Sequence, residues 1–267
     1  MRTPFSDALA LTRAGHGFTA TLTQDWTIGA KLHGGLLLAL CAKAARCALG
    51  VPGVQPLAVS ASYLSAPSPG TVELVVDVRK RGRSVSVVDV ELRQGDRSAV
   101  ACVVTMGTVD DAAPLHVRSC AHPPMPAQPP AEAIDVAEHP TGAVMHLSAV
   151  CDLRLDPVTA AFAGGRTDGA AELRLWARPR GEQPDALFAL LAADVSPPVT
   201  LNLGRAGWAP TVQLTALLRA APAPGWLRVH TSSRCVGATW FDEEAEVTDE
   251  AGTLVCQSRQ LAMLPRP

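Results

Sequence analysis

The amino-acid sequence predicts an α+β fold of two similar units in tandem, each a curved antiparallel sheet wrapped around one central helix. The segment 34–49, "GGLLLALCAKAARCAL", is apolar on nearly every side, with Lys43 and Arg46 its only charged residues. A helix of that kind must be enclosed by other structure. Several other segments alternate apolar and polar residues, as half-buried strands do. The chain also repeats itself, which predicts two units.

The internal repeat aligns 57–74 with 212–229 without gaps, at a constant offset of 155 residues. Both copies contain Pro-x-Pro-Gly between two strand-like runs. Proline fixes φ and glycine permits a positive φ, so this tetrapeptide predicts a turn. Two copies indicate a duplicated unit, because a repeat array needs more.

Each unit is predicted to have the same order of elements. The first has a short strand within 18–28, the helix at 34–49, and strands at 56–64, 71–80, 84–94 and 98–108. The second has strands at 145–155 and 169–178, a helix at 184–195, and strands at 211–219, 226–234, 238–248 and 253–264. We therefore predict an N-terminal unit at 1–108, a proline-rich surface linker at 109–142, and a C-terminal unit at 143–267. A sheet wrapped around a helix is the hotdog fold, so the whole is a double hotdog.

Composition narrows the function. The chain has 267 residues, 48% of them hydrophobic and 18% charged, which is enough for a sizeable core. A net charge of −2 predicts no general attraction to nucleic acid or to an anionic membrane. We find no signal segment, no apolar run long enough for a membrane span, and no phosphate loop, serine elbow or metal-ligand spacing. We expect a soluble cytoplasmic protein without metal or cofactor.

The cysteines form an odd set without CxxC or Cys/His ligand spacing. Most lie in apolar runs, so we expect buried free thiols in a reducing compartment. They are Cys41, Cys47, Cys102, Cys120, Cys151, Cys235 and Cys256.

Four motifs connect the chain with a known family. They are "WTI" followed after four residues by "HGG" at 26–35, "YLSAPSPG" at 63–70, "RKRGRS" at 79–84 and "GTLVCQSRQLAML" at 252–264. In this order and spacing they resemble the acyl-CoA thioesterase II-like double-hotdog proteins. The resemblance implies hydrolysis of acyl-CoA by a monomeric double hotdog or a homo-oligomer of it. The alternatives are a non-catalytic acyl-thioester-binding protein and a hotdog hydratase or dehydratase.

The start of the first helix offers donors for this chemistry. Thioester hydrolysis needs a water, a base, and donors where the carbonyl oxygen becomes an oxyanion. The first amides of a helix are unsatisfied and carry partial positive charge. Gly34 and Gly35 would let a carbonyl approach them without a Cβ in the way, with His33 beside them. The alternative is that the glycines serve close helix packing and that His33 makes a local hydrogen bond.

A polar set in the second unit complements these glycines. Asp194 shares the apolar face of the predicted second helix, where a carboxylate is unfavourable unless paired or used. The resemblance implies that a helix Asp, a strand Thr and a Gln near the chain's end orient the water; they fall on Asp194, Thr211 and Gln260. Thr215 is the alternative threonine, and the loop before Gln260 is shorter than in the family. Burial and the helix C-terminus should raise the pKa of Asp194.

Each unit lacks what the other has. By the repeat offset, the counterparts of the Asp, Thr and Gln are Ala39, Pro56 and Met106, while the position matching His33 is Phe188. We therefore predict one composite site between the two helices, with the three apolar counterparts packing as core.

Charged clusters have weaker assignments. Arginine forks suit phosphate, so Arg79, Arg81, Arg83 and Arg205 are candidates for binding the phosphates of CoA. Such clusters also serve as solvated faces or salt-bridge partners. The acidic run 242–246, with Asp242, Glu243, Glu244 and Glu246, is expected to face solvent.

Overall fold

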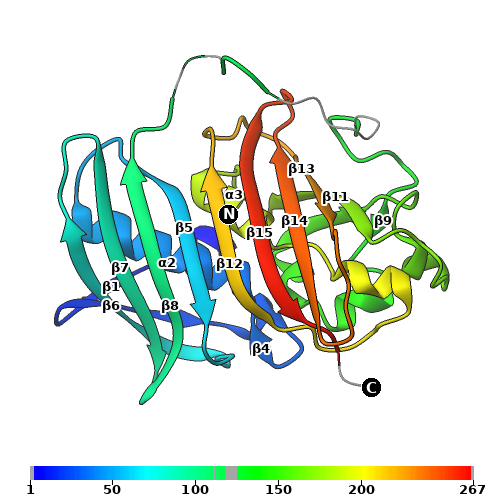
Figure 1. Cartoon of the computed structure of the whole chain (residues 1–267), viewed down its shortest axis with the longest axis horizontal. Coiled ribbons are helices and arrows are strands. Elements are labelled where there is room, and N and C mark those ends of the chain that lie inside the picture. The colour runs from blue at the N-terminus through cyan, green and yellow to red at the C-terminus, as the bar shows by residue number, and fades with distance from the viewer. Residues whose placement is uncertain (1–2, 111, 113, 118–124, 266–267) are drawn as a thin grey trace.

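The computed structural model describes residues 3–110, 112, 114–117 and 125–265, and within them one continuous antiparallel sheet runs through both units (Figure 1). Its strands lie in the order β1 (Thr12–Ala14), β2 (Gly17–Leu22), β6 (Gly70–Lys80), β7 (Val85–Gln94), β8 (Arg97–Gly107), β5 (Gln55–Tyr63), β12 (Thr211–Leu218), β15 (Leu254–Met263), β14 (Trp240–Thr248), β13 (Leu227–Ser232), β11 (Glu172–Pro179), β10 (Cys151–Leu155) and β9 (Ile134–Asp135). Two short strands, β3 (Thr27–Ile28) and β4 (Lys31–Leu32), pair separately. This arrangement agrees with the predicted double hotdog.

The helix α2 (Gly34–Leu49) fills the N-terminal unit and packs against β2 and β5 to β8. Its residues from Leu36 to Ala42 are at most 1% exposed, as expected for a helix with an almost continuous apolar surface. It ends at Gly50, whose φ of 63° is left-handed and whose N–H bonds to the carbonyl of Arg46. Enclosure by the curved sheet explains why so apolar a helix is stable in this chain.

The helix α3 (Ala186–Ala192) has the corresponding place in the C-terminal unit, against β11, β12, β13 and β15. It is shorter than the predicted helix at 184–195. Asp185 caps its start, and Asp194 lies in the turn after it, with its N–H bonded to the Leu191 carbonyl. Pro197 and Pro198 follow Asp194 after two residues, and proline disfavours helical backbone before it. Figure 1 shows both helices behind the sheet.

The remaining helical segments are short. They are α1 (Pro4–Ala8), η1 (Gln24–Trp26), η2 (Pro140–Ala143), η3 (His146–Ala149), η4 (Ala161–Gly164) and η5 (Val199–Leu203). Within the described residues, none of the helices is both long and apolar enough to cross a membrane.

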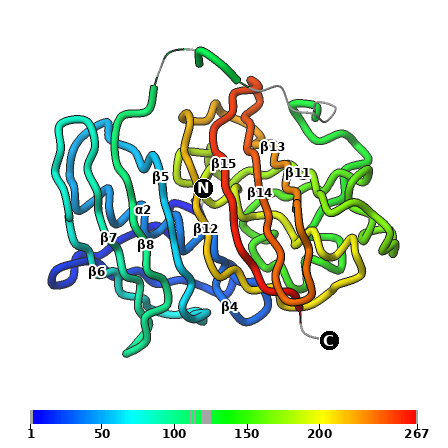
Figure 2. The backbone as a smooth tube through the Cα atoms, in the orientation of Figure 1, coloured from blue at the N-terminus to red at the C-terminus, as the bar shows by residue number. Residues whose placement is uncertain are grey.

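The two units join where β5 pairs with β12, and Figure 2 shows these strands side by side in the middle of the sheet. Ser60 lies opposite Thr215 with their hydroxyl oxygens 2.8 Å apart. These two residues are also matched by the repeat offset of 155. A residue that faces its own counterpart marks a pseudo-two-fold axis, so the repeat in the sequence corresponds to symmetry at the seam.

The helices follow a different offset from the strands. Their caps, His33 and Asp185, are 152 residues apart, because the second unit has three more residues between cap and seam. The counterpart of His33 is therefore Asp185, and the assignment to Phe188 was wrong. On the helix offset Asp194 matches Ala42, which is fully buried like Ala39.

Part of the predicted linker belongs to the C-terminal sheet. β9 lies inside 109–142 and pairs with β10, and Val136 beside it is buried. Of the cysteines, Cys120 lies outside the described residues and Cys235 is exposed, contrary to the expected burial. The other five are free thiols that are buried or half-buried.

Candidate active site

The start of α2 meets the turn after α3, so the site is built from both units. An ideal Cβ on Gly34 would lie 2.9 Å from Asp194 Oδ2, and one on Gly35 would lie 2.9 Å from Asp194 Cβ. The helix end and the carboxylate are therefore in direct contact. Close packing requires the two glycines. The group against which they pack is Asp194, the predicted catalytic carboxylate.

His33 links the two helices as a neutral side chain. Its Nδ1 accepts a hydrogen bond from the Leu36 N–H at 3.3 Å and so caps α2. Nε2 then carries the proton and donates to the Asp194 backbone carbonyl at 3.1 Å. Burial lowers the pKa of His33 to about 4, although the bond to the Asp194 carbonyl opposes this. A histidine held neutral in one tautomer orients its neighbours and does not act as a base at neutral pH.

Asp194 is a buried carboxyl poised to titrate at neutral pH. Burial raises its pKa to about 7, and a hydrogen bond from the Gly35 backbone N–H opposes the rise. This confirms the direction predicted from the sequence, with burial as the dominant cause. A base is most effective when its pKa is near the working pH. The Gly35 amide, expected as an oxyanion donor, here faces the carboxylate.

A strand irregularity positions Thr211 beside Gln260. Thr211 Oγ1 donates to Gln260 Oε1 at 2.6 Å. Leu214 lies directly opposite Gln260, and side chains three residues apart on a regular strand point to opposite faces. The β-bulge between Thr211 and Gln213 inserts one extra residue, so that Thr211 points inward, to the same face as Gln260. Thr215, the alternative threonine, bonds instead to Ser60 at the seam.

The turn carrying Asp194 is tied to the same strand. Ser258, two residues before Gln260 and on the same inward face, donates to the Ala193 carbonyl at 2.6 Å. Thr211 and Gln260 are thus bonded to each other on the inner face of β15, and the turn that carries Asp194 is bonded to the same strand two residues away.

The prediction that Glu243 faces solvent was wrong: its side chain faces the interior and is 4% exposed. Its Oε2 accepts from Gln260 Nε2 at 2.6 Å, and its Oε1 accepts from the Val199 N–H at 2.8 Å. Burial raises its pKa to about 8; the Val199 bond opposes the rise and the charge of Asp194 adds to it. A signal was present, because strict alternation places Glu243 on the face of Phe241, Ala245 and Val247.

Tyr63 is a second residue that the sequence did not point to. Its hydroxyl donates to the Gly34 carbonyl at 2.9 Å, so the last residue of β5 holds the first turn of α2. Burial, aided by the charge of Asp194, raises its pKa well above the usual range. Tyr63 is thus a neutral hydroxyl beside the site. Its position at the start of "YLSAPSPG" was the available signal.

The arginines of the N-terminal unit lie away from this site. Arg81 donates to the carbonyls of Ala48 and Leu49, at the far end of a 16-residue helix about 24 Å long. Arg79 pairs with Asp77 and Asp89 on its own sheet, and Arg83 is exposed in the same hairpin. Arg205 is exposed after η5, the helix whose first residue is bonded to Glu243. Of the four, only Arg205 borders the elements of the site.

The pseudo-symmetric location has no comparable groups. Ala39 and Met106 are fully buried and Pro56 is buried, which confirms that they pack as core. The start of α3 is also occupied, because Asp185 Oδ1 accepts from the N–H groups of Leu187 and Phe188. Helix amides capped by a carboxylate cannot serve an oxyanion.

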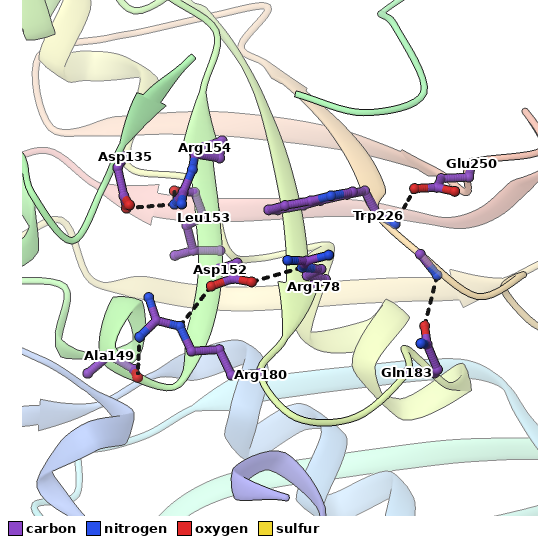
Figure 3. A network of polar contacts seen from close by, with 11 residues as sticks. Asp135, Ala149, Asp152, Leu153, Arg154, Arg178, Arg180, Gln183, Trp226 and Glu250 are labelled. Atoms are coloured by element: carbon purple, nitrogen blue, oxygen red, sulfur yellow. Dashed lines mark hydrogen bonds and ion pairs between the residues drawn. The ribbon is translucent and has the colours of Figure 1, made fainter. Parts of the chain in front are cut away.

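A separate polar network lies on β10 and β11 (Figure 3). Asp152 accepts from the Nε atoms of Arg178 and Arg180, each at 2.8 Å, and the Arg178 guanidinium lies 4.2 Å from the centre of the Trp226 ring. Burial would raise the pKa of Asp152, but the two arginines hold it below its usual value. Asp152, Arg178 and Arg180 line an open cavity of about 610 Å³. Its lining includes none of the predicted site residues. Its charged groups are engaged, because Asp152, Arg178 and Arg180 form ion pairs and Glu182 accepts from the N–H groups of Phe5 and Ser6.

The two glycines predict different outcomes for Gly→Ala substitution. In Gly35→Ala the new Cβ would lie 2.9 Å from the Leu191 backbone oxygen, which cannot move alone, so we expect a loss of about 1–3 kcal/mol in unfolding free energy. In Gly34→Ala the nearest atom is Asp194 Oδ2, which belongs to a side chain and can shift without the backbone, so stability should fall less while the carboxyl is displaced. Denaturant unfolding of both variants measures this. Gly164→Ala, with open space around it, is the control, and equal stability of all three would contradict the packing argument.

Comparison with known proteins gives a consistent picture. A family model for the acyl-CoA thioesterase N-terminal domain matches residues 22–109, and one for the C-terminal domain matches 119–264. An uncharacterized protein of Mycobacterium tuberculosis is 48% identical over 266 residues, covering 93% of this chain and 91% of that protein. A crystal structure from Thermobifida fusca, described as a candidate thioesterase II, has 31% identity and a TM-score of 0.87, covering 99% of this chain and 98% of that one. A hot dog protein from Alicyclobacillus acidocaldarius has 21% identity and a TM-score of 0.83 over the whole of both chains.

Proposed function

The chain belongs to the acyl-CoA thioesterase family, and from this premise we propose that it hydrolyses acyl-CoA thioesters to the free acid and CoA. The observation that carries the proposal is the contact between a buried carboxyl, Asp194, and the glycine-rich start of α2. A base and a positively polarised helix end then lie next to each other, as the reaction of a thioester carbonyl requires.

In the proposed reaction, a water attacks the carbonyl carbon while Asp194 takes its proton. The Thr211 hydroxyl, which donates its own hydrogen to Gln260, has lone pairs left to accept the second hydrogen of the water. The tetrahedral intermediate collapses and expels the CoA thiolate. The thiolate receives the proton from Asp194, so the water's oxygen remains on the acid and the base is restored.

The negative charge on the carbonyl oxygen is proposed to form at the start of α2. The Gly34 amide and the positive end of the helix dipole would stabilise it. The Gly35 amide holds the carboxylate of Asp194 in place. Arg205, on the exposed loop after η5, is the proposed contact for a CoA phosphate.

The direct test is incubation with a series of acyl-CoAs in the presence of a thiol reagent. Hydrolysis releases free CoA, whose thiol reacts, and Asp194→Asn should abolish most of this release. A non-catalytic binding protein would retain the acyl-CoA without releasing thiol. A hydratase would change an enoyl-CoA without releasing thiol. Either of those results would refute the proposed hydrolysis.

A further inference from the structure

Glu243 determines the direction of a chain of hydrogen bonds in the site. The Val199 N–H can only donate, so Glu243 Oε1 accepts. When Glu243 is ionised, its Oε2 also accepts, so the end of Gln260 that faces it is the amide NH₂. The other end of Gln260 is then the oxygen, to which the Thr211 hydroxyl donates. The ionised carboxylate of Glu243, held by the Val199 N–H, thus fixes through the Gln260 amide which way the Thr211 hydrogen points.

We propose that Glu243, in its ionised form, is a positioning residue for hydrolysis: by holding the Gln260 amide in one orientation, it keeps the Thr211 lone pairs directed at the attacking water. This inference rests on the proposed function. If Glu243 donated instead, the Gln260 amide would turn over, its NH₂ would face Thr211, and the hydroxyl would become an acceptor there. The Thr211 hydrogen would then be free to point at the water, and one of its two lone pairs would be taken up by the Gln260 NH₂.

The ionisation of Glu243 depends on the charged groups near it. Among the described residues, the charges acting on it are Asp194, from the turn after α3, and Asp242, from its own strand. Asp242 points to the other face, where it pairs with Arg259 of β15. His33, across the site, is neutral at pH 7 because its pKa is about 4. Glu243 and Asp194 therefore titrate as an interacting pair.

The first test is Glu243→Gln, which keeps the shape and reverses the polarity. The new amide oxygen would accept from Val199 and its NH₂ would face Gln260, turning that amide over. We expect kcat to fall about 10- to 100-fold, as misplacement in an active site does, with KM changed less than about twofold. In wild type the pH profile of kcat should show a second inflection near pH 8, absent from the variant. The matched control is Glu244→Gln on the outer face of the same strand, where it pairs with Arg234 and Arg259.

The second test is rescue. The double variant Glu243→Gln with Gln260→Glu exchanges the amide and the carboxylate, so that Thr211 again donates, now to Glu at 260. We expect it to recover at least about tenfold in kcat over Glu243→Gln alone. Failure of this rescue, or a Glu243→Gln variant as active as the Glu244→Gln control, would overturn the proposal.

A third measurement does not depend on activity. In NMR spectra of the full chain, the side-chain NH₂ signals of Gln260 should shift with pH as Glu243 ionises, and should lose this shift in Glu243→Gln. Gln260 NH₂ signals that do not shift as Glu243 ionises would overturn the positioning role. Absence of hydrolysis by wild type with unchanged NMR behaviour would instead refute the proposed function and leave the hydrogen-bond assignment intact.

Discussion

Asp194→Asn is expected to lower kcat for acyl-CoA hydrolysis by about 10²-fold or more, the usual scale for loss of a general base. The amide has nearly the same shape as the carboxyl but cannot take the water's proton. In wild type, kcat/KM should fall about tenfold per pH unit below pH 7, because Asp194 then becomes protonated. Steady-state kinetics across pH would measure both effects. Near-normal turnover in the variant would remove Asp194 from the mechanism.

Thermal unfolding is the folding control for Asp194→Asn, and the direction of the change in Tm can be predicted. The pKa of Asp194 is about 7 when folded and about 3.8 when unfolded, so the folded state holds the proton more tightly. Asp194 therefore makes wild type less stable as pH rises from about 4 to 7. Because asparagine is neutral, Asp194→Asn should melt at a higher temperature than wild type at pH 8, with a smaller difference at pH 5. The exposed Asp168→Asn should change neither activity nor Tm.

Each chain is expected to bind one equivalent of a non-hydrolysable acyl-CoA analogue, although the fold has two pseudo-symmetric locations. Only one location combines glycine amides with a buried carboxyl. The other contains Ala42, Pro56 and Met106 at the matching positions, and Asp185 caps its helix. Calorimetric titration of wild type would give the stoichiometry.

The same composite arrangement predicts the effect of substitutions in either unit. Gly34→Val places side-chain atoms against Asp194 Oδ2, and Asp194→Asn removes the base, so each alone should abolish most turnover. Gly164→Val, in open space, should retain it. Two equivalents bound per chain, or half of the activity surviving in each variant, would contradict a single composite site.

The fold could largely be predicted because its signals are local. The almost wholly apolar run at 34–49 is the observed helix α2, and period-2 alternation located most strands to within a few residues. The strand predicted at 145–155 was wrong in its first half, because η3 occupies His146–Ala149 and β10 begins at Cys151. The repeat also predicted that two units adjoin, and the Ser60 and Thr215 pair lies at their seam. The shorter helix α3 is where local reasoning failed, because the apolar pattern continues beyond the point at which the backbone turns.

The amino-acid sequence by itself determined the two units, their order of elements, and the complementary residues Gly34, Gly35 and Asp194. Only the tertiary structure decided the environment of Glu243, the inward turn of Thr211 and the tie from Tyr63 to Gly34. These depend on a β-bulge and on contacts between segments distant in the chain, which no local pattern encodes. Burial in the tertiary structure also sets the pKa of Asp194. Its carboxyl would ionise near pH 4 in water but titrates near neutrality when the folded chain encloses it.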